Sequence, residues 1–293
     1  MAKASKKGPA KSRPLVLLSN DDGYRATGIE TLRARLQEFA DVILFAPEFE
    51  QSAMSHALTL HRPLRLHRID DKTFALDGTP ADCVYLALIG WDRWFKRRPD
   101  FVVSGINHGP NLGQDVFYSG TVAAAREGAF RGLPSFALSA HRGADHGRIA
   151  DWFADFLAFG WERKVLQDRG PSLLSLNFPD GWKAAVEVTR LGATKYEDLV
   201  DFRTDPRGRE YAWIGGPPLP VDAKAGTDSA ADAKGVASIS LLSLDQNLVP
   251  PQNASSGKDD LDAFRQFVRS FETWRKVPQK TPRKRAPRKT NRR

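Results

Sequence analysis

Short runs of apolar residues alternate with segments of helical periodicity along the first two thirds of the chain. The first run, Leu15–Leu18, is continuous and is followed by a cluster of turn-forming residues at Asn20–Gly23, a pattern typical of a short buried strand. Apolar residues then recur every three or four positions between Ile29 and Phe39, which predicts a helix with one apolar face. A strand followed by a helix is the repeating unit of α/β proteins.

This alternation continues as far as about residue 180. Further strands are predicted at Val42–Ala46, Leu64–Ile69, Thr73–Leu76, Phe101–Val103, Phe136–Leu138 and Leu173–Leu176. Further helices are predicted at Ala81–Ile89, directly after Pro80, at Thr121–Phe130 and at Ile149–Phe159. We therefore expect an α/β fold built on a Rossmann-like, doubly wound and mostly parallel sheet.

The pattern changes beyond residue 180. Strands are predicted at Val186–Thr189, Tyr211–Ile214 and Val236–Leu242, with long polar loops between them, and a helix at Asp259–Trp274. We interpret this part as a smaller β-rich extension that ends in a C-terminal helix. The organisation we expect is a basic arm at 1–13, an α/β core at 14–180, the extension and final helix at 181–276, and a basic tail at 277–293.

The positive charge of the chain is concentrated at its two ends. The formal net charge is +9, from 44 lysines and arginines against 35 acidic residues. Residues 1–13 hold five basic residues and residues 277–293 hold eight, and neither segment contains an acid; the body between them keeps 31 basic against 35 acidic residues. Block-charged segments of this kind are typical of disordered, solvated arms. Contact with nucleic acid through these arms is the alternative that the charge leaves open.

The short apolar stretches and the single cysteine exclude several classes of protein. No stretch approaches the roughly 20 apolar residues of a membrane span. The four-residue run at Leu15–Leu18 is also shorter than the apolar core of a signal peptide, which takes about 7–15 residues. Cys83 is the single cysteine, so neither an intrachain disulfide nor a cysteine-cluster metal site can form. We expect a cytoplasmic protein without a membrane contact.

Two neighbouring carboxylates follow the first predicted strand. Asp21 and Asp22 repel one another at one strand end, and a cation between them would relieve that repulsion. Oxygen ligands suit the hard divalent cations Mg²⁺, Mn²⁺ and Ca²⁺. A plain turn with two solvated acids is the alternative for this segment taken alone.

Small and hydroxyl-bearing residues precede the helix predicted at Thr121–Phe130. The segment from Ser104 to Thr121 is rich in Gly, Ser and Asn, and it has no Gly-Lys-Ser/Thr, so it is not a Walker P-loop. The free backbone N–H groups and the dipole at a helix start favour an anion. A metal and an anion at the same end of a sheet point to phosphoryl transfer or phosphate hydrolysis.

Five collinear motifs resemble the SurE family, the survival-protein nucleotidases. They are Ser19–Tyr24, Ala46–Glu48 with Ser52, Asp77–Cys83, Ser104–Asn107 and Tyr118–Gly128. The resemblance extends from about Leu15 to Leu244, through Asn177–Pro179, Thr189-Arg190 and Asp205–Gly208, and leaves both basic ends outside it. Asp77–Pro80 can equally be a structural turn and helix start, which is the interpretation we favour.

The resemblance implies a phosphatase that depends on one divalent metal ion, Mg²⁺ or Mn²⁺, and hydrolyses nucleoside monophosphates, as a 5′-nucleotidase with 3′ esters as a further option. It implies that Asp21, Asp22, Ser52 and Asn107 bind the metal, with Asp21 and Asp22 also catalytic. We expect phosphate and substrate to contact Asn20, Asn111, Tyr118, Ser119, Gly120 and Thr121. The family further implies a homodimer or homotetramer, in which the extension after residue 180 reaches a partner.

Other roles at this site stay open. His56 closely follows the Ser52 segment and is a candidate general acid for the leaving group. Tyr24 and Tyr118 are candidates for stacking on a base. An exopolyphosphatase or general phosphatase could use the same site, and a nucleic-acid-associated protein that binds through its basic ends is the non-enzymatic alternative.

Overall fold

The computed structural model describes residues 13–168, 170–219, 223–245 and 257–276. The chain divides into two compact units, residues 1–252 and residues 253–293, and each is described by itself. Among the described helices, none has the length and apolar character needed to cross a membrane.

The first unit is built around a nine-stranded sheet with the strand order β3-β4-β2-β1-β5-β6-β7-β11-β8. Its strands are β1 (Leu15–Ser19), β2 (Asp41–Pro47), β3 (Leu66–Asp70), β4 (Thr73–Leu76), β5 (Phe101–His108), β6 (Pro134–Ala140), β7 (Ser172–Phe178), β8 (Val186–Thr189) and β11 (Ala237–Leu242). Neighbouring strands from β4 to β7 run parallel, while β3 and β11 pair antiparallel with β4 and β7. The expected doubly wound, mostly parallel α/β fold is confirmed.

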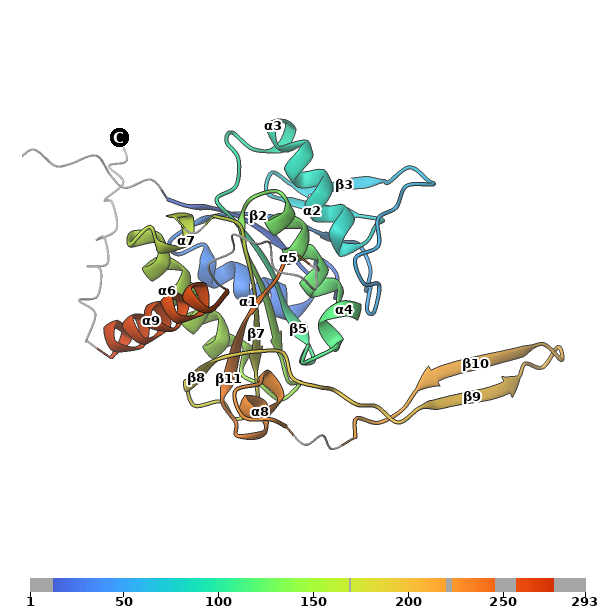
Figure 1. Ribbon diagram of the computed structural model, residues 1–293. Coiled ribbons are helices and arrows are strands. Elements are labelled where there is room, and N and C mark those ends of the chain that lie inside the picture. Colours follow the sequence, from blue (N-terminus) through green and yellow to red (C-terminus); the bar gives the residue numbers. More distant parts are fainter. Residues whose placement is uncertain (1–12, 169, 220–222, 246–256, 277–293) are drawn as a thin grey trace, which may run out of the picture. The chain divides into compact units, whose positions relative to one another are not determined.

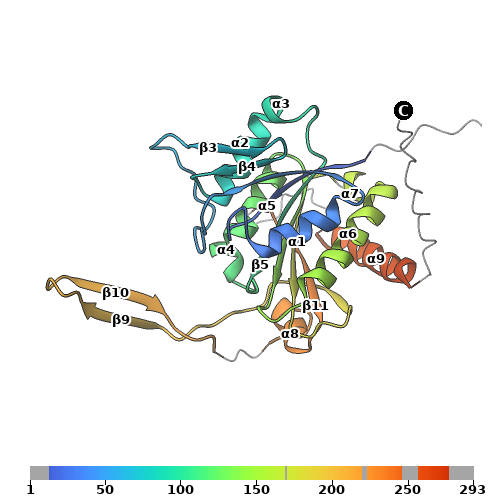
Figure 2. The same cartoon turned by 180° about the vertical axis from the view of Figure 1, so that it is seen from behind.

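Helices cover both faces of the sheet. The helices of this unit are α1 (Thr27–Leu36), α2 (Pro80–Ile89), α3 (Trp91–Trp94), α4 (Asp115–Tyr118), α5 (Gly120–Phe130), α6 (His146–Glu162), α7 (Val165–Asp168) and α8 (Asp228–Ala233). Figure 1 shows α2 and α5 side by side on one face, and Figure 2 shows α1 and α6 on the other. Every residue of β1 is buried as a result, which explains its continuous apolar run.

The order of the strands reverses at β1. From β1 the chain builds outward through β2 and β4 on one side, and it then returns to add β5, β6 and β7 on the other side. The carboxyl ends of β1 and β5 therefore lie side by side, with Ser19 in register with Ser104. In open α/β sheets this reversal creates the crevice in which ligands bind.

The segment after residue 180 contributes to two sheets. β8 and β11 extend the main sheet, because β11 pairs with β7 and β8 pairs with β11. Only β9 (Leu199–Thr204) and β10 (Glu210–Gly215) form a sheet of their own, an antiparallel hairpin that stands apart from the main sheet (Figure 1). The boundary that we expected at residue 180 thus does not coincide with a boundary between sheets.

The two ends of the chain are described only in part. Residues 1–12 and 277–293, which carry the predicted disordered arms, lie outside the described residues. Arg13 was assigned to the first arm, but its guanidinium donates to the carbonyls of Gln37 and Ala40 at 2.6 and 2.8 Å, so it belongs to the fold. In the second unit, α9 (Gly257–Arg275) confirms the predicted final helix.

Most predicted elements are present with shifted ends. The largest shift is at β5, because the segment Ser104–His108, which the sequence indicated as a glycine-rich loop, continues the strand. Gly105 permits this course: its φ is +124°, and an added Cβ would collide with the backbone oxygen of Leu138. β9 was not predicted, since it mixes charged with apolar residues, and neither were the helices α3, α4, α7 and α8, which have only four to six residues each.

Candidate functional site

The predicted site lies at the carboxyl ends of β1 and β5. Ser19 and Asn20 are completely buried, and Asp21 is only 4% exposed. The segment that follows β2 reaches the same place, because Gln51 N–H donates to the backbone oxygen of Asp21 at 2.7 Å. Three predicted site segments, those after β1, after β2 and before α5, therefore meet at the strand-order reversal, as the α/β topology predicts.

Asp21 is hydrogen-bonded to the first turn of α5. Both of its carboxylate oxygens accept hydrogen bonds from Thr121, one from the backbone N–H at 3.0 Å and one from the hydroxyl. Gly120 allows this approach, because a Cβ there would lie 2.8 Å from the Cβ of Asp21. Burial, with the charge of Asp22 adding to it, raises the pKa of Asp21 to about 6 against the opposing effect of the Thr121 hydrogen bonds.

Asp22 is held less tightly than its neighbour. Its side chain is 11% exposed, and one oxygen lies 3.4 Å from the backbone nitrogen of His108, while the other lies 3.7 Å from His108 Nδ1. Burial raises the pKa of Asp22, and the carboxylate of Glu50 adds to the rise, whereas His108 and His146 oppose it. Asp22 is thus the less restrained carboxylate of the two.

At the N-terminus of α5, backbone N–H groups and two hydroxyls already have partners within the chain. Ser119 caps the helix, since its Oγ accepts from the N–H of Val122 at 3.1 Å. The Thr121 hydroxyl donates to Asp21. Tyr118 ends α4 and is 66% exposed, so its ring is available to a ligand. Because the N–H groups of Thr121, Val122 and Ala123 already donate to Asp21 or Ser119, the helix start favours an anion mainly through its dipole.

Ser52 and Asn107 lie in the two other predicted metal-binding segments. Ser52 is exposed, and its Oγ donates to Glu50 Oε1 at 2.7 Å. Asn107, near the end of β5, donates from Nδ2 to the backbone oxygen of Gly109 at 2.9 Å. Because the nitrogen of Asn107 is engaged, its side-chain oxygen is the atom that can bind a cation.

Asn20 and Asn111 differ in the use of their side chains. Asn20 donates from Nδ2 to Gly23 O at 2.8 Å, while its Oδ1 is buried and has no hydrogen-bond partner in the described part of the chain. The side chain of Asn111 is used within the fold, because its Nδ2 donates to Ser139 Oγ at 2.7 Å. The backbone N–H and carbonyl of Asn111 pair with the side chain of Asn177, at 2.7 and 3.1 Å. A buried carbonyl oxygen without a donor is costly, so Asn20 Oδ1 marks a place for a bound group.

These residues fit a hard divalent cation. In the described residues, neither Asp21 nor Asp22 pairs with a lysine or arginine, so their repulsion is not relieved by a strong cation of the chain. No group of three His, Cys, Asp or Glu side chains in those same residues could hold a metal ion. The predicted set differs from such a group, because it combines two carboxylates with a hydroxyl and an amide oxygen, which are ligands that Mg²⁺ and Mn²⁺ accept.

His56 does not point at the two carboxylates in this structure. Its Nε2 lies 3.0 Å from Glu127 Oε2, and its ring stacks on Phe130 with the centroids 5.6 Å apart. Glu127 is 2% exposed and also accepts from Arg131 at 2.8 Å. Glu127 lies six residues after Thr121, or about 9 Å along the helix, so this pair anchors the loop rather than the phosphate end of α5.

The structure adds two histidines that the sequence analysis left without a role. His108 faces Asp22, and its ring stacks on His146 at a centroid distance of 5.5 Å. His146 opens α6, and burial lowers its pKa, with the charge of His108 adding to the decrease. A sequence signal for this pair is lacking, because 38 residues separate the two positions and neither lies in a periodic pattern.

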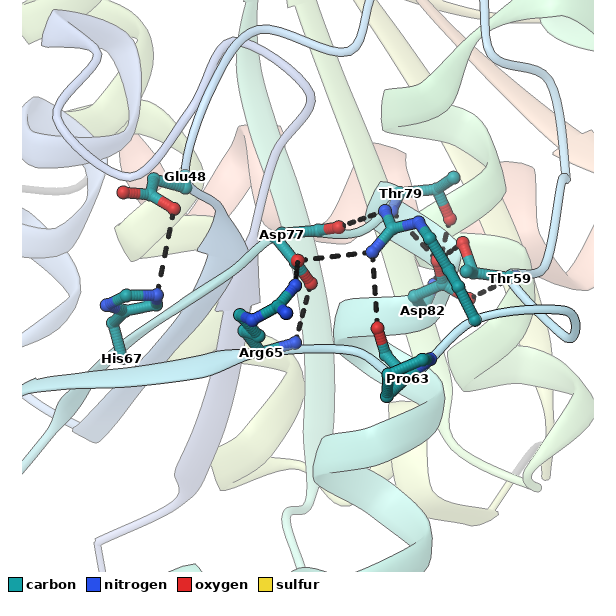
Figure 3. A network of polar contacts seen from close by, with 9 residues as sticks. Glu48, Thr59, Pro63, Arg65, His67, Asp77, Thr79 and Asp82 are labelled. Carbon is teal, nitrogen blue, oxygen red and sulfur yellow. Dashed lines mark hydrogen bonds and ion pairs between the residues drawn. The ribbon is translucent and has the colours of Figure 1, made fainter.

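The Asp77–Cys83 motif is a helix start and a set of loop anchors, as favoured from the sequence. Thr79 and Asp82 form a reciprocal capping box at the N-terminus of α2. Figure 3 shows Asp82 also accepting from the backbone N–H and the hydroxyl of Thr59, at 2.8 and 2.6 Å. Asp77 accepts from the N–H of Arg65 at 2.6 Å, and this lowers its pKa.

Comparison with known proteins agrees with this arrangement. Residues 16–198 match the family model described as survival protein SurE. The chain belongs to the SurE family. Among curated SurE proteins, the 5′-nucleotidase SurE of Sorangium cellulosum (strain So ce56) is 52% identical over 235 residues, which is 80% of this chain and 91% of that protein. The 5′-nucleotidase SurE of Anaeromyxobacter sp. (strain Fw109-5) is 46% identical over 79% of this chain and 91% of its own length.

A solved SurE structure has the same fold. The crystal structure of the SurE protein from Aquifex aeolicus superposes with a TM-score of 0.67 at 37% sequence identity. The match covers 80% of this chain and 95% of that one. The mostly parallel sheet and the additional strands after residue 180 are therefore features of a SurE fold.

Proposed function

We propose that this SurE chain is a 5′-nucleotidase, a phosphoric monoester hydrolase that releases phosphate from nucleoside monophosphates. Curated relatives carry that name, and the match with this chain covers 91% and 89% of the length of two of them. The single observation that carries the proposal is the pair of hydrogen bonds from Thr121 to Asp21, because they join two neighbouring carboxylates to a helix start whose dipole favours phosphate.

The proposed cofactor is one divalent ion, Mg²⁺ or Mn²⁺, held by Asp21, Asp22, Ser52 and Asn107. When bound, such an ion supplies positive charge beside the ester oxygens and lowers the pKa of a coordinated water. The loose packing around Ser52 and the free side-chain oxygen of Asn107 suit this role.

The chain's own residues bind and orient the reactants. We assign phosphate binding to the start of α5 through the helix dipole, while the N–H and hydroxyl of Thr121 hold Asp21 in place and favour its ionised form. Asp22, the less restrained carboxylate, orients the attacking water and accepts its proton. General base catalysis contributes about 10²–10⁴ in rate, and positioning contributes roughly 7–11 kcal/mol, so positioning does more of the work.

We assign the contacts with the nucleoside and with a partner subunit to two exposed surfaces. Tyr118 is exposed beside the helix start and can stack on a base. The hairpin β9–β10 exposes a strip of apolar side chains, which we assign to contact with a second copy in a homodimer or homotetramer.

A substrate panel tests the proposed function. Phosphate release is measured from nucleoside 5′- and 3′-monophosphates, short polyphosphate and an aryl phosphate, each with Mg²⁺, Mn²⁺ or EDTA. We expect turnover of nucleoside 5′-monophosphates with metal and none with EDTA. Preference for polyphosphate or aryl phosphate would replace the proposal by one of the other phosphatase activities, and salt-sensitive RNA binding without turnover would replace it by the binding role.

The Asp22→Asn variant tests the proposed role of its carboxylate. We expect kcat to fall at least about a hundredfold, because the amide neither accepts a proton nor binds a cation well. Asp71→Asn is the matched control, since the Asp71 side chain is 94% exposed in a surface ion pair with Arg68. Comparable activity in both variants would show that Asp22 does not take part in the reaction.

A further inference from the structure

The loop that follows Ser52 is fixed at several points, whereas Ser52 itself is exposed. Thr59 is anchored on Asp82, and the carbonyl of Ala57 accepts from the Thr79 hydroxyl at 2.7 Å. His56 is anchored on Glu127 of α5. These contacts fix the far end of the loop to α2 and to the middle of α5, but they lie four to seven residues from Ser52.

Ser55 is the anchor nearest to Ser52, and it contacts the segment that precedes α5. Its backbone N–H donates to the carbonyl of Tyr118 at 2.9 Å, and its Oγ donates to the carbonyl of Phe117 at 2.6 Å. Both carbonyls belong to α4, which leads directly into Ser119 and the phosphate end of α5. Ser55 therefore joins the segment with a proposed metal ligand to the segment with the proposed phosphate contacts.

The backbone of this loop depends on such an anchor. Ser55 has φ +52° and Ala53 has φ +58°, a left-handed conformation that costs energy for residues other than glycine. Ala53 and Ser55 lie on either side of Met54, so the backbone adopts this conformation twice within three residues. Tertiary contacts must hold the loop in this shape, and the hydroxyl of Ser55 supplies one of them.

We propose that Ser55 is a positioning residue that holds Ser52 in register with the phosphate-binding start of α5. It acts through the carbonyls of Phe117 and Tyr118 and touches neither metal nor substrate. The inference rests on the proposed function, because it takes Ser52 as a metal ligand. It predicts that metal binding and phosphate binding weaken together when the Ser55 hydroxyl is removed.

The experiment compares Ser55→Ala and Ser55→Gly with the wild-type chain. Calorimetric titration of the metal-free protein with Mn²⁺ gives the metal affinity, and inhibition of the Mn²⁺-loaded enzyme by inorganic phosphate gives the phosphate affinity. Removing one hydrogen bond should weaken each affinity about threefold to tenfold. Thr31→Val is the matched control, because it removes a hydroxyl-to-carbonyl bond of 2.8 Å within α1.

The two Ser55 variants separate the hydrogen bond from the backbone conformation. Both lose the hydroxyl, but glycine adopts a positive φ without cost. Equal weakening in both variants supports the proposal, whereas weakening in Ser55→Ala alone overturns it in favour of backbone strain. If the wild-type chain binds Mn²⁺ and both variants bind it equally well, only this inference fails; if the wild-type chain does not bind Mn²⁺, the proposed function fails with it.

Discussion

Asp21 and Asp22 are neighbours in sequence, yet the fold gives them different environments. Asp21 accepts two hydrogen bonds from Thr121, while Asp22 faces His108 across a longer distance. The difference arises from their partners and not from strand alternation, because β1 ends at Ser19 and both residues lie in the bend that follows. In the proposed metal site, the first carboxylate is thus the fixed ligand and the second the adjustable one.

The contact between His141 and Asp232, which lies outside this site, should depend on pH. His141 Nε2 is 2.9 Å from Asp232 Oδ1, which joins the end of β6 to α8, and this hydrogen bond raises the pKa of His141. Because the folded-state pKa is above the unfolded value, the stabilisation is fully present below about pH 6.5 and is lost as the pH rises through the folded-state value. His141→Gln should therefore lower the unfolding midpoint more at pH 5.5 than at pH 8.5.

Urea unfolding of both proteins at the two pH values checks this. His61→Gln is the control, since His61 is exposed and lies in a bend outside the strands and helices. A loss of stability in His141→Gln that is as large at pH 8.5 as at pH 5.5 would mean that the contact does not depend on the charge of the histidine.

At the scale of elements, the sequence was most informative where one local pattern decides the structure. The buried run Leu15–Leu18 and the apolar period between Ile29 and Leu36 identified β1 and α1. Local patterns failed where a distant segment decides: Ser104–His108 is rich in residues typical of loops, but pairing with β6 continues the strand. The same holds for the site, because nothing local shows that Thr121 would bind Asp21 or that Glu127 would bind His56.

The N-terminus of α2 offers a prediction about an element. Thr79 accepts from the N–H of Asp82, and its hydroxyl also donates to the carbonyl of Ala57. Thr79→Ala should lower the free energy of unfolding by about 1–2 kcal/mol, because it removes a helix cap and a loop anchor. Urea denaturation measures this, with Thr273→Ala in an exposed turn of α9 as the control. An effect no larger than that of the control would show that the capping box contributes little.

At the scale of the whole molecule, part of the apolar surface of the first unit is left uncovered by the described part of the chain. The hairpin register places Phe202 opposite Ala212 and Val200 opposite Ile214, so these four side chains share one face. Phe202 is 74% exposed and Ile214 is 89% exposed. A two-stranded hairpin is only marginally stable in water, so this apolar face is the surface that we propose a second copy covers.

The last prediction follows from this face. In the proposed homodimer or homotetramer, Phe202→Glu and Ile214→Glu should each favour a smaller species, because a carboxylate buried in an apolar interface loses its hydration. Light scattering coupled to size-exclusion chromatography measures the mass, and circular dichroism checks that the main sheet stays folded. Arg203→Glu is the matched control, since Arg203 lies on the opposite face of the same strand and pairs with Asp201. If the control reduces the mass as much as the two other variants do, the apolar face is not the contact surface, and the subunits associate through another part of the chain.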